Sequence, residues 1–263
     1  MVADHASSVL KERAAGGCGL SRQWLEFGIN RKCAKRPCMV VPYSGTLYAV
    51  KQYTMDWYYE EAKKTADIFA GVPIYEPTRI LAEALWEGID EVVGQARRAM
   101  VWLQSVSDVC VEHGIPPQWF SPSGFLCRQG YEKHRNRSVK TIVGEKIRQH
   151  RLREGTGELD RVKNRNGIVP NWVHSIDGAV AGTSTRKSRD QGIQFLSWIH
   201  DACQALPGDM EAVRDNTRQA VIECFRDCPM QTLVRDITPL LPQGVSLPEP
   251  PEVGDLDLNE VAT

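Results

Sequence analysis

Arg31, Lys35 and Tyr43 are spaced so that they could together bind phosphate groups and a sugar. On a helix, Arg31 and Lys35 lie one turn apart and their cationic groups share one face. Tyr43 lies eight residues beyond Lys35, which corresponds to about 12 Å along a helix axis. That length is comparable to the span from a triphosphate to its ribose, and both cations supply charge-assisted donors for phosphate. The alternative interpretation is a solvated helix face that ends at a tyrosine.

His200 and Asp201 follow a short apolar run and form a second candidate, for a metal ion. A carboxylate at the tip of a hairpin can coordinate Mg²⁺, a hard cation that prefers oxygen ligands. Two-metal phosphoryl transfer needs a second carboxylate, because the two ions stabilise both the attacking and the leaving oxygen. We therefore expect the partner of Asp201 to come from elsewhere. Taken in isolation, the His-Asp pair is equally typical of a surface turn.

A basic stretch lies within a chain whose formal net charge is −1. Between Cys127 and Arg165 there are twelve Lys and Arg residues against five acidic residues, a local net charge of about +7. From Ser246 onward there are five acidic residues and no basic one. The basic stretch could contact a polyanion or could be a solvated loop, and charge alone leaves both interpretations open.

The composition is that of a soluble globular protein, with 42% hydrophobic and 25% charged residues in a chain of 263. That length allows one large domain or two ordinary ones. The eight cysteines include no C-x2-C pair, and no histidine has zinc-finger spacing, so we expect free thiols. The sequence has no signal peptide and no apolar run of about 18 residues, and we expect a cytoplasmic protein with reduced thiols and no membrane contact.

The apolar pattern also predicts the elements that position these candidates. Proline and glycine close several of them, such as Pro42 and Ser44–Gly45 after the segment with Arg31 and Lys35. Apolar residues at spacings of three and four predict a long helix from Pro77 to Gly114, with a break near Gly88 or Gly94. The other expected elements are helices at Val2–Ala15, from Ser21 toward Met39, at Gln52–Ala70 and at Met210–Cys228, strand-and-turn structure at Trp119–Tyr131, a buried strand at Ile193–Ile199, a turn at Leu206–Asp209, and an extended acidic tail after Pro242.

The segment from Trp24 to Tyr43 resembles the fingers helix of phage and mitochondrial single-subunit DNA-directed RNA polymerases. In that family the segment reads as Trp-Leu, Gly, Arg-x3-Lys, Met and then Tyr-Gly. The resemblance implies that Lys35 contacts the incoming triphosphate and is catalytic, that Arg31 assists it, and that Tyr43 helps to distinguish ribose from deoxyribose. Two departures occur in this chain. Pro37 lies inside the helix, and Ser44 stands where the family has glycine, with Gly45 one position later.

Two further segments resemble the same family. Gly167–Gly178 is similar to a segment that reads Gly-Ile-x-Pro-Asn-Phe-x-His-Ser-x-Asp-Gly, which implies that His174 helps to sense a 2′-hydroxyl group. An imidazole can match a group that both donates and accepts a hydrogen bond, although a capping or core histidine is the alternative. Ile199–Asp209 resembles the palm hairpin, so Asp201 is expected to bind the metal and His200 to be its active-site neighbour. Ala202 and Met39 occupy positions at which related DNA polymerases carry Glu and Phe.

The basic stretch occupies the position of the family's specificity loop, a β-hairpin that enters the major groove of the promoter and later lines the RNA exit path. The resemblance therefore implies a nucleic-acid interface in this part of the chain. Arginine reads guanine edges, and lysine mostly contacts phosphates. The candidate nucleic-acid-binding residues are Arg135, Arg137, Lys140, Lys146, Arg148 and His150.

The resemblance implies a mainly helical α+β fold made of polymerase fingers and a partial palm with a short antiparallel hairpin. We expect a fingers-like helical region at 1–115, a basic insertion at 116–166, a palm-like region at 167–242 and an acidic tail at 243–263. The expected partners are a DNA template and promoter, nascent RNA, NTPs and Mg²⁺. We expect the chain to be a C-terminal fragment or a split subunit that lacks the first catalytic aspartate. A separate N-terminal polymerase portion would carry that aspartate, and we expect no polymerisation by this chain alone.

Two other functions remain open from the sequence. One is a non-catalytic nucleic-acid-binding protein descended from a polymerase, which Pro37, Ser44 and the missing carboxylate would explain. The other is a fragment of a related DNA polymerase of family A. A preference for NTPs over dNTPs would exclude the DNA polymerase, and copurification with a larger chain would favour the enzyme over the binding protein.

Overall fold

The computed structural model describes residues 1–144 and 146–261. The chain divides into two compact units, Met1–Val101 and Trp102–Thr263, and we describe each by itself. The secondary structure is mainly helical with small antiparallel hairpins, which confirms the expected α+β class. Among the described residues, no helix combines the length and apolar character needed to cross a membrane.

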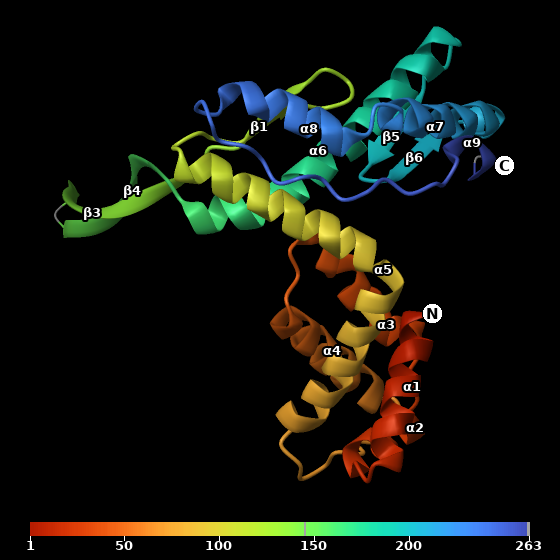
Figure 1. Ribbon diagram of the computed structural model, residues 1–263. Coiled ribbons are helices and arrows are strands. Elements are labelled where there is room, and N and C mark those ends of the chain that lie inside the picture. Colours follow the sequence, from red (N-terminus) through yellow and green to blue (C-terminus); the bar gives the residue numbers. More distant parts are fainter. Residues whose placement is uncertain (145, 262–263) are drawn as a thin grey trace. The chain divides into compact units, whose positions relative to one another are not determined.

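The first unit is entirely helical within its described residues (Figure 1). The expected helix at the N-terminus and the long scaffold helix are both confirmed. Its elements are α1 (Val2–Ala15), α2 (Gly19–Phe27), α3 (Arg31–Val40), the 3₁₀ turn η1 (Val41–Tyr43), α4 (Leu47–Ala62) and the first part of α5 (Tyr75–Glu112).

An aromatic cluster around Trp24 holds α2, α4 and the start of α5 together. Trp24 is fully buried, and its Nε1 donates a hydrogen bond to the Pro77 carbonyl oxygen at 2.7 Å. Aromatic pairs of this kind each contribute about 0.5–1.5 kcal/mol beyond the area that they bury. The rings that contact Trp24 belong to Phe27, Trp57, Tyr58 and Phe69.

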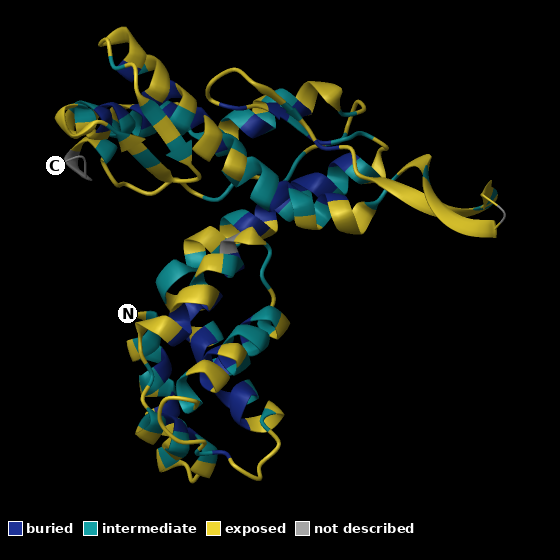
Figure 2. Cartoon of the chain, turned by 180° about the vertical axis from the view of Figure 1, so that it is seen from behind, coloured by how far each residue is buried: buried dark blue, intermediate teal, exposed yellow. Residues whose placement is uncertain are grey.

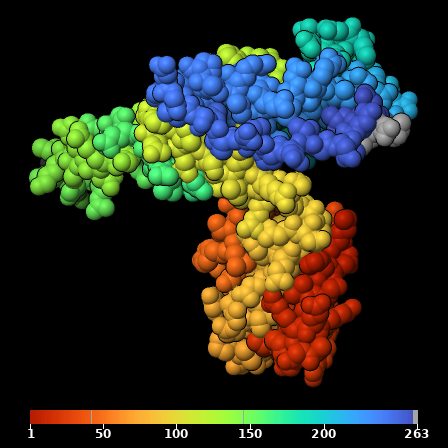
Figure 3. Space-filling model, in the orientation of Figure 1, coloured from red at the N-terminus to blue at the C-terminus, as the bar shows by residue number. Residues whose placement is uncertain are grey.

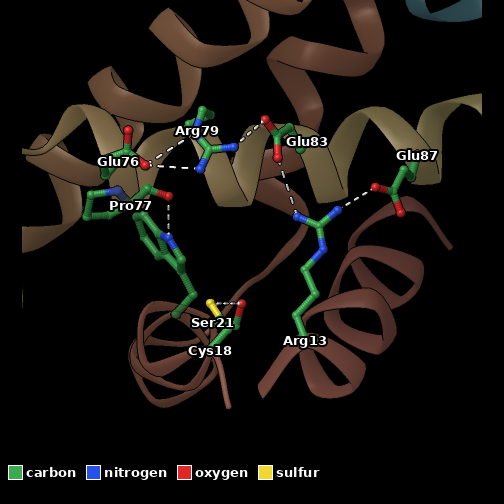
Figure 4. Close-up of polar contacts among 9 residues, drawn as sticks. Arg13, Cys18, Ser21, Glu76, Pro77, Arg79, Glu83 and Glu87 are labelled. Atoms are coloured by element: carbon green, nitrogen blue, oxygen red, sulfur yellow. Dashed lines mark hydrogen bonds and ion pairs between the residues drawn. The ribbon is translucent and has the colours of Figure 1, made fainter. Parts of the chain in front are cut away.

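Helix α1 lies against α5 because Gly88 removes a side chain at their crossing. A Cβ atom at Gly88 would lie 3.0 Å from the Val2 carbonyl oxygen. At the other end of α1, Arg13 forms ion pairs with Glu87 at 2.5 Å and with Glu83 at 3.6 Å (Figure 4). Partly exposed pairs of this type contribute at most about 1 kcal/mol each, so the apolar packing of the two helices dominates.

Two expected helix boundaries in this unit are wrong. The stretch from Ser21 to Met39 is two helices, because Gly28 adopts a positive φ of 90° and the Asn30 side chain caps α3 by accepting from Lys32 N at 2.9 Å. The helix expected at Gln52–Ala70 begins earlier and ends at Ala62. The residues that follow α4 fold back instead, because the Phe69 amide donates to the Tyr58 hydroxyl at 3.2 Å.

Helix α5 contains the break that the sequence predicted near one of its glycines. Val93 has non-helical angles (φ −127°, ψ 26°) and lies beside Gly94, so this position, and not Gly88, is where the helix is kinked. The helix ends at Glu112, and Gly114 follows with a φ of 69°. Glycine at this position permits the left-handed backbone that ends a helix.

The second unit is built on α6 (Arg161–Asp190) and α7 (Met210–Phe225), which pack side by side (Figures 1 and 2). Buried residues Ile168, Val213 and Ala220 belong to these two helices. Its other elements are β1 (Gln118–Phe120), β2 (Leu126–Arg128), β3 (Glu132–Val143), β4 (Lys146–Leu159), β5 (Leu196–Ile199), β6 (Ala202–Ala205), η2 (Pro207–Asp209), α8 (Pro229–Ile237), η3 (Thr238–Leu240) and α9 (Leu258–Val261).

The strands of the second unit form three separate two-stranded antiparallel sheets, β1–β2, β3–β4 and β5–β6. The β3–β4 hairpin projects from the rest of its unit, and nearly all of its residues are exposed (Figures 2 and 3). The acidic tail is extended for most of its length, as expected, and Trp102 Nε1 fastens it by donating to the Pro248 carbonyl oxygen at 2.9 Å.

The buried strand expected at Ile193–Ile199 is wrong in its burial. The strand exists as β5, but Ile199 is 56% exposed and the adjacent Phe195 is 65% exposed. Only one face of this two-stranded sheet packs against the rest of the unit. Trp198 lies on that face, and its Nε1 donates to Thr185 Oγ1 of α6 at 2.9 Å. The apolar run therefore marks an exposed hairpin and not an internal strand.

Candidate functional site

Helix α3 presents Arg31 and Lys35 to solvent on one side. Its opposite side carries Cys33, Ala34 and Pro37, all buried. Burial raises the pKa of the Cys33 thiol to about 12, so this cysteine stays protonated and inert. The helix thus divides into an apolar side that fixes it and a cationic side that is accessible to a phosphate ligand.

Pro37 is accommodated within α3, which continues through it to Val40. A proline cannot donate to the carbonyl of residue 33, so the helix lacks one hydrogen bond at this turn. Its ring lies on the buried side, where it contributes apolar surface, while Arg31 and Lys35 remain on the exposed side. The proline therefore leaves the cationic side of the helix in its helical geometry.

Tyr43 does not continue the same α-helix, which corrects the straight-helix estimate of its separation from Lys35. The α-helix ends at Val40, and Tyr43 is the last residue of the 3₁₀ turn η1. Ser44 then takes a left-handed backbone (φ 66°, ψ 26°), a conformation that glycine adopts without strain. Gly45 approaches so closely that a Cβ atom would lie 2.5 Å from the Val40 carbonyl oxygen.

Tyr43 is 39% exposed at this turn, so its ring is accessible from solvent. The polymerases that this chain resembles have glycine at the position of Ser44. The left-handed backbone at this position explains that preference, and in this chain serine adopts the same conformation. The glycine at 45 is required for a different reason, the close approach to Val40. Ser44 and Gly45 thus end the helical segment directly after Tyr43.

Asp201 lies in the two-residue loop between β5 and β6, where Ile199 pairs with Ala202. His200 precedes it with a φ of 55°, a left-handed conformation that is uncommon for residues other than glycine. Strained backbone of this kind costs on the order of 1–3 kcal/mol and clusters at functional sites. Both side chains are exposed, and the loop presents the carboxylate at the tip of a hairpin, as the sequence predicted.

Asp201 offers a donor of the type that Mg²⁺ prefers, an exposed carboxylate oxygen. Within residues 1–144 and 146–261, however, no three His, Cys, Asp or Glu side chains come together in a group that could hold a metal ion. The chemistry of Asp201 therefore fits a single carboxylate ligand of a divalent cation, and in the described part of the chain it belongs to no group of three such side chains.

The Gly167–Gly178 segment lies inside α6 and supports the base of the β3–β4 hairpin. A Cβ atom at Gly167 would lie 2.7 Å from the ring of Tyr131, so glycine is needed for this ring to pack on the helix. Asn171 Nδ2 donates to Gln129 Oε1 at 2.7 Å and to the Tyr131 hydroxyl at 3.1 Å. Buried Asn164 also bonds the backbone of Tyr131 in both directions.

His174 lines an open cleft of ≈ 830 Å³ between α6 and the β1–β2 hairpin. Its side chain is exposed, and Asn171 lies one turn before it on the same wall of the cleft. The facing wall consists of Trp119, Ser121, Ser123 and residues 125–129. Trp119 connects the two walls, because its Nε1 donates to Ser175 Oγ at 3.0 Å.

The pairing of β3 with β4 places the six basic candidates on two faces. Residues directly opposite each other in an antiparallel pair point to the same side. Arg135 is opposite Glu154, Arg137 is opposite Leu152, and Lys140 is opposite Gln149. The register therefore puts Arg135, Arg137, Lys146, Arg148 and His150 on one face, and Lys140 alone among the candidates on the other.

The face that carries Lys140 contains side chains that the sequence reasoning did not select. Asn136 lies opposite Arg153, and Ser138 lies opposite Arg151. Arginine, asparagine and glutamine are the residue types that form paired hydrogen bonds with base edges. On the opposite face, Arg135 forms an ion pair with Glu154 at 3.0 Å, which makes Arg135 less available to contact nucleic acid.

The two units divide the predicted site residues between them. Arg31, Lys35 and Tyr43 belong to the first unit, and His174, His200, Asp201 and the β3–β4 hairpin belong to the second. Arg31 and Lys35 share one helix face, as predicted. Asp201 is not among the residues that line the cleft of His174.

Comparisons with known proteins give a consistent result across the chain. The family model described as "DNA-dependent RNA polymerase" matches residues 1–250. The chain is 28% identical over 259 residues to the DNA-directed RNA polymerase of Pseudomonas phage phiKMV, covering 97% of this chain and 30% of that protein. It is 25% identical to T7 RNA polymerase of Escherichia phage T7, covering 86% of this chain and 28% of the relative. It is 24% identical to the chloroplastic DNA-directed RNA polymerase 3 of Nicotiana sylvestris, covering 96% of this chain and 25% of that protein. The chain thus spans less than a third of the length of these relatives.

Proposed function

The chain belongs to the DNA-dependent RNA polymerase family, and on this premise we propose that it supplies part of the active site for RNA synthesis from NTPs on a DNA template. Residues 1–115 provide a fingers-like region, 116–166 a specificity hairpin, 167–242 a palm-like region and 243–263 an acidic tail. The observation that carries this proposal is the exposed cationic face of α3, with Arg31 and Lys35 one turn apart above a buried apolar side.

Lys35 contacts the triphosphate of the incoming NTP and acts in catalysis, and Arg31 assists it. Both cations favour binding of phosphate oxygens, and in nucleotidyl transfer they offset charge on the pyrophosphate as it leaves. Tyr43 lies just past the end of the same helix and contacts the ribose. His174 recognises a 2′-hydroxyl group at the cleft of the second unit. Ala202 and Met39, which stand where related DNA polymerases carry Glu and Phe, support an RNA polymerase over a DNA polymerase.

Asp201 holds a Mg²⁺ ion together with a carboxylate supplied by polypeptide outside these 263 residues. Such an ion would stabilise charge on the phosphate oxygens during transfer. The exposure of Asp201 supports this role, since a second chain segment can approach the hairpin tip. His200, with its left-handed backbone, sets the direction of the Asp201 carboxylate and is its neighbour in the active site.

The β3–β4 hairpin contacts promoter DNA and then nascent RNA. Its length, its exposure and its basic side chains support a polyanion interface. Arg135, Arg137, Lys146, Arg148 and His150 form one contact face, and Lys140 forms the other with Asn136, Gln149, Arg151 and Arg153. If the protein is phage-encoded, these contacts occur in the cytoplasm of the host cell.

An RNA-synthesis assay tests the proposal. With Mg²⁺, NTPs and a primed DNA template, the 263-residue chain alone produces no RNA, whereas addition of the polypeptide with the other carboxylate gives synthesis. In that assembly, Lys35→Ala lowers synthesis strongly, and the control Lys11→Ala on α1 leaves it unchanged. Robust synthesis by the chain alone would contradict the two-part site. A preference for dNTPs would instead identify a DNA polymerase.

A second candidate function is nucleic-acid binding without catalysis. The observation that favours it is that, among the described residues, Asp201 belongs to no group of three or more His, Cys, Asp or Glu side chains that could hold a metal ion. The two functions differ in one readout. A binding protein retains salt-sensitive binding to DNA, yet gives no RNA synthesis when any polymerase portion is added.

A further inference from the structure

We propose that Phe125 is a stacking platform for an unpaired nucleobase in the cleft that also contains His174. This inference rests on the proposed function, because it adds a contact to the cleft already assigned to nucleic acid. The side chain of Phe125 is 72% exposed although it is a large apolar ring. It lines the cleft together with Leu126 and Arg128, opposite the α6 wall with Asn171 and His174.

The backbone that presents Phe125 is held by a closed set of hydrogen bonds. The Phe125 amide donates to Ser121 Oγ at 3.2 Å, and its carbonyl oxygen accepts from the Ser121 amide at 2.9 Å. Ser121 is buried, and Gly124 supplies the positive φ of 83° that closes the turn. An aromatic ring on a fixed turn can accept a stacking base at little additional ordering cost.

The opposite wall of the cleft leaves room for a planar ligand. His174 and Gly178 lie one turn apart on α6, and both line the cleft. A Cβ atom built at Gly178 would have no neighbouring atom within 4 Å, so this part of the wall is open. The cleft volume of ≈ 830 Å³ falls within the range of about 300–1,000 Å³ that is usual for ligand sites.

The charge of the cleft favours a nucleic-acid strand as its occupant. Among the described residues that line it, Arg128 is basic and none is Asp or Glu. A neighbouring cavity of ≈ 190 Å³ is lined by Glu223, Asp227 and Arg235, a net charge of about −1, and is therefore less favourable for phosphates. The chain continues from Arg128 directly into the basic β3–β4 hairpin, so a bound strand meets positive charge beyond the cleft.

The chemistry that follows is recognition of a base by its π-face and not by its edge. Aromatic side chains stack on any base, because every base has such a face, and the interaction depends little on sequence. Arg128 then contacts the adjacent phosphate. Phe125 is therefore a contact to a single strand, distinct in mechanism from the sequence-reading side chains of the β3–β4 hairpin.

The test compares binding of a short single-stranded oligonucleotide with binding of an oligonucleotide of the same length that carries no bases. Affinities of the full 263-residue chain are measured by fluorescence anisotropy at low salt, with RNA and DNA versions of each strand. Phe125→Ala weakens binding of the base-bearing strand by about 5- to 150-fold and leaves the base-free strand unchanged. Phe125→Trp retains the difference between the two strands, because the larger ring still stacks.

Phe120→Ala is the matched control. Phe120 is also an exposed phenylalanine (52%) of the β1–β2 hairpin, but it lines the acidic cavity and not the cleft of His174. Its removal leaves the preference for base-bearing strands intact. Since Phe125 is largely exposed, Phe125→Ala also leaves the melting temperature almost unchanged.

Two outcomes would overturn the proposal, and they can be told apart. If Phe125→Ala binds base-bearing strands as tightly as the unmodified chain, the stacking role is wrong while the proposed function stands. If the unmodified chain binds neither strand in a salt-dependent manner, both the stacking role and the nucleic-acid interface fail. A stronger effect with RNA than with DNA identifies RNA as the occupant, and equal effects identify single strands of either kind.

Discussion

Asn171 donates a hydrogen bond from its Nδ2 atom to Oε1 of Gln129 over 2.7 Å, and this contact joins α6 to the base of the β3–β4 hairpin. The same nitrogen lies 3.1 Å from the Tyr131 hydroxyl, so one amide fixes two residues that precede the hairpin. Gln129 is buried and in turn donates to the Asn164 carbonyl oxygen at 2.6 Å. The direction of an otherwise exposed hairpin is thus set by a small polar network at its base.

Asn171→Ala should destabilise the protein and loosen the hairpin. The substitution leaves the buried Gln129 acceptor without its donor, which costs about 1–3 kcal/mol of unfolding free energy. Urea denaturation measures this loss, and hydrogen exchange should become faster in residues 132–159. The control is Val162→Ala at a position of the same helix that is 66% exposed. An equal effect of both substitutions would show that the network does not hold the hairpin.

Gly167→Ala and Gly182→Ala should change stability in opposite directions although both glycines lie in α6. At Gly167 the new methyl group meets the Tyr131 ring at 2.7 Å, so packing must shift and the melting temperature falls. At Gly182 no atom lies within 4 Å, so alanine should stabilise the helix by about 1 kcal/mol. Thermal unfolding measures both effects.

The double variant Gly167→Ala with Tyr131→Ala checks the cause. If the clash is responsible, removal of the ring makes the two changes non-additive, and the double variant loses less stability than the sum of the single ones. Additive losses would mean that Gly167 is needed for some reason other than the Tyr131 ring.

Fold elements with a strong local signal could be predicted from the sequence, and their exact boundaries could not. The periodicity from Ile80 to Leu103 was sufficient for α5. The break between α2 and α3 depends on one glycine with a positive φ and one asparagine cap, both weak signals in a continuous apolar pattern. The end of α4 depends on a hydrogen bond between Phe69 and Tyr58, which are eleven residues apart in the sequence. This contact is visible only in the folded structure.

The candidate site shows the same division. The i, i+4 spacing of Arg31 and Lys35 predicted their shared face, because both lie within one helix. The position of Tyr43 was wrong in detail, since a left-handed Ser44 and the close approach of Gly45 to Val40 end the helix before it. The partition of the hairpin into two faces required the register of β3 with β4, which the charge count alone does not contain.

Arg151→Ala and Arg153→Ala should each weaken DNA binding and reduce its salt dependence. Both residues are exposed on the hairpin face that also carries Lys140. Loss of one phosphate contact lowers the slope of log K against log salt by about 1, whereas loss of a base contact changes affinity with little change in slope. Anisotropy titrations over a range of salt concentrations give both quantities.

Arg189→Ala is the control for the hairpin variants. Arg189 is exposed at the end of α6, outside the hairpin, and pairs with Asp190 at 3.0 Å. It should leave both affinity and slope unchanged. If this variant weakens binding as much as Arg151→Ala, the interface is diffuse positive charge and the hairpin face has no special role.

The cysteines should differ in reactivity toward a thiol-alkylating reagent as pH changes. The Ser21 hydroxyl donates to the Cys18 sulfur at 3.2 Å and lowers the pKa of Cys18, which favours its thiolate. Burial raises the pKa of Cys33 to about 12 and that of Cys110 to about 11. Because only the thiolate reacts, Cys18 should be alkylated at the lowest pH.

Mass spectrometry of the folded protein after brief alkylation at several pH values measures this order. Ser21→Ala should move the reaction of Cys18 to higher pH, since it removes the hydrogen bond that stabilises the thiolate. Reaction of Cys33 or Cys110 before Cys18 in the folded chain would contradict the packing of α3 and α5 described above.

The most direct test of the proposed role of the chain is RNA synthesis by the assembled polymerase with Asp201→Asn. Asparagine keeps the size of the side chain and removes the negative charge that Mg²⁺ requires. The expected result is loss of RNA synthesis with unchanged DNA binding, while Asp215→Asn, at an exposed position of α7, has no effect. Unchanged synthesis with Asp201→Asn would contradict the assignment of this carboxylate to the active site.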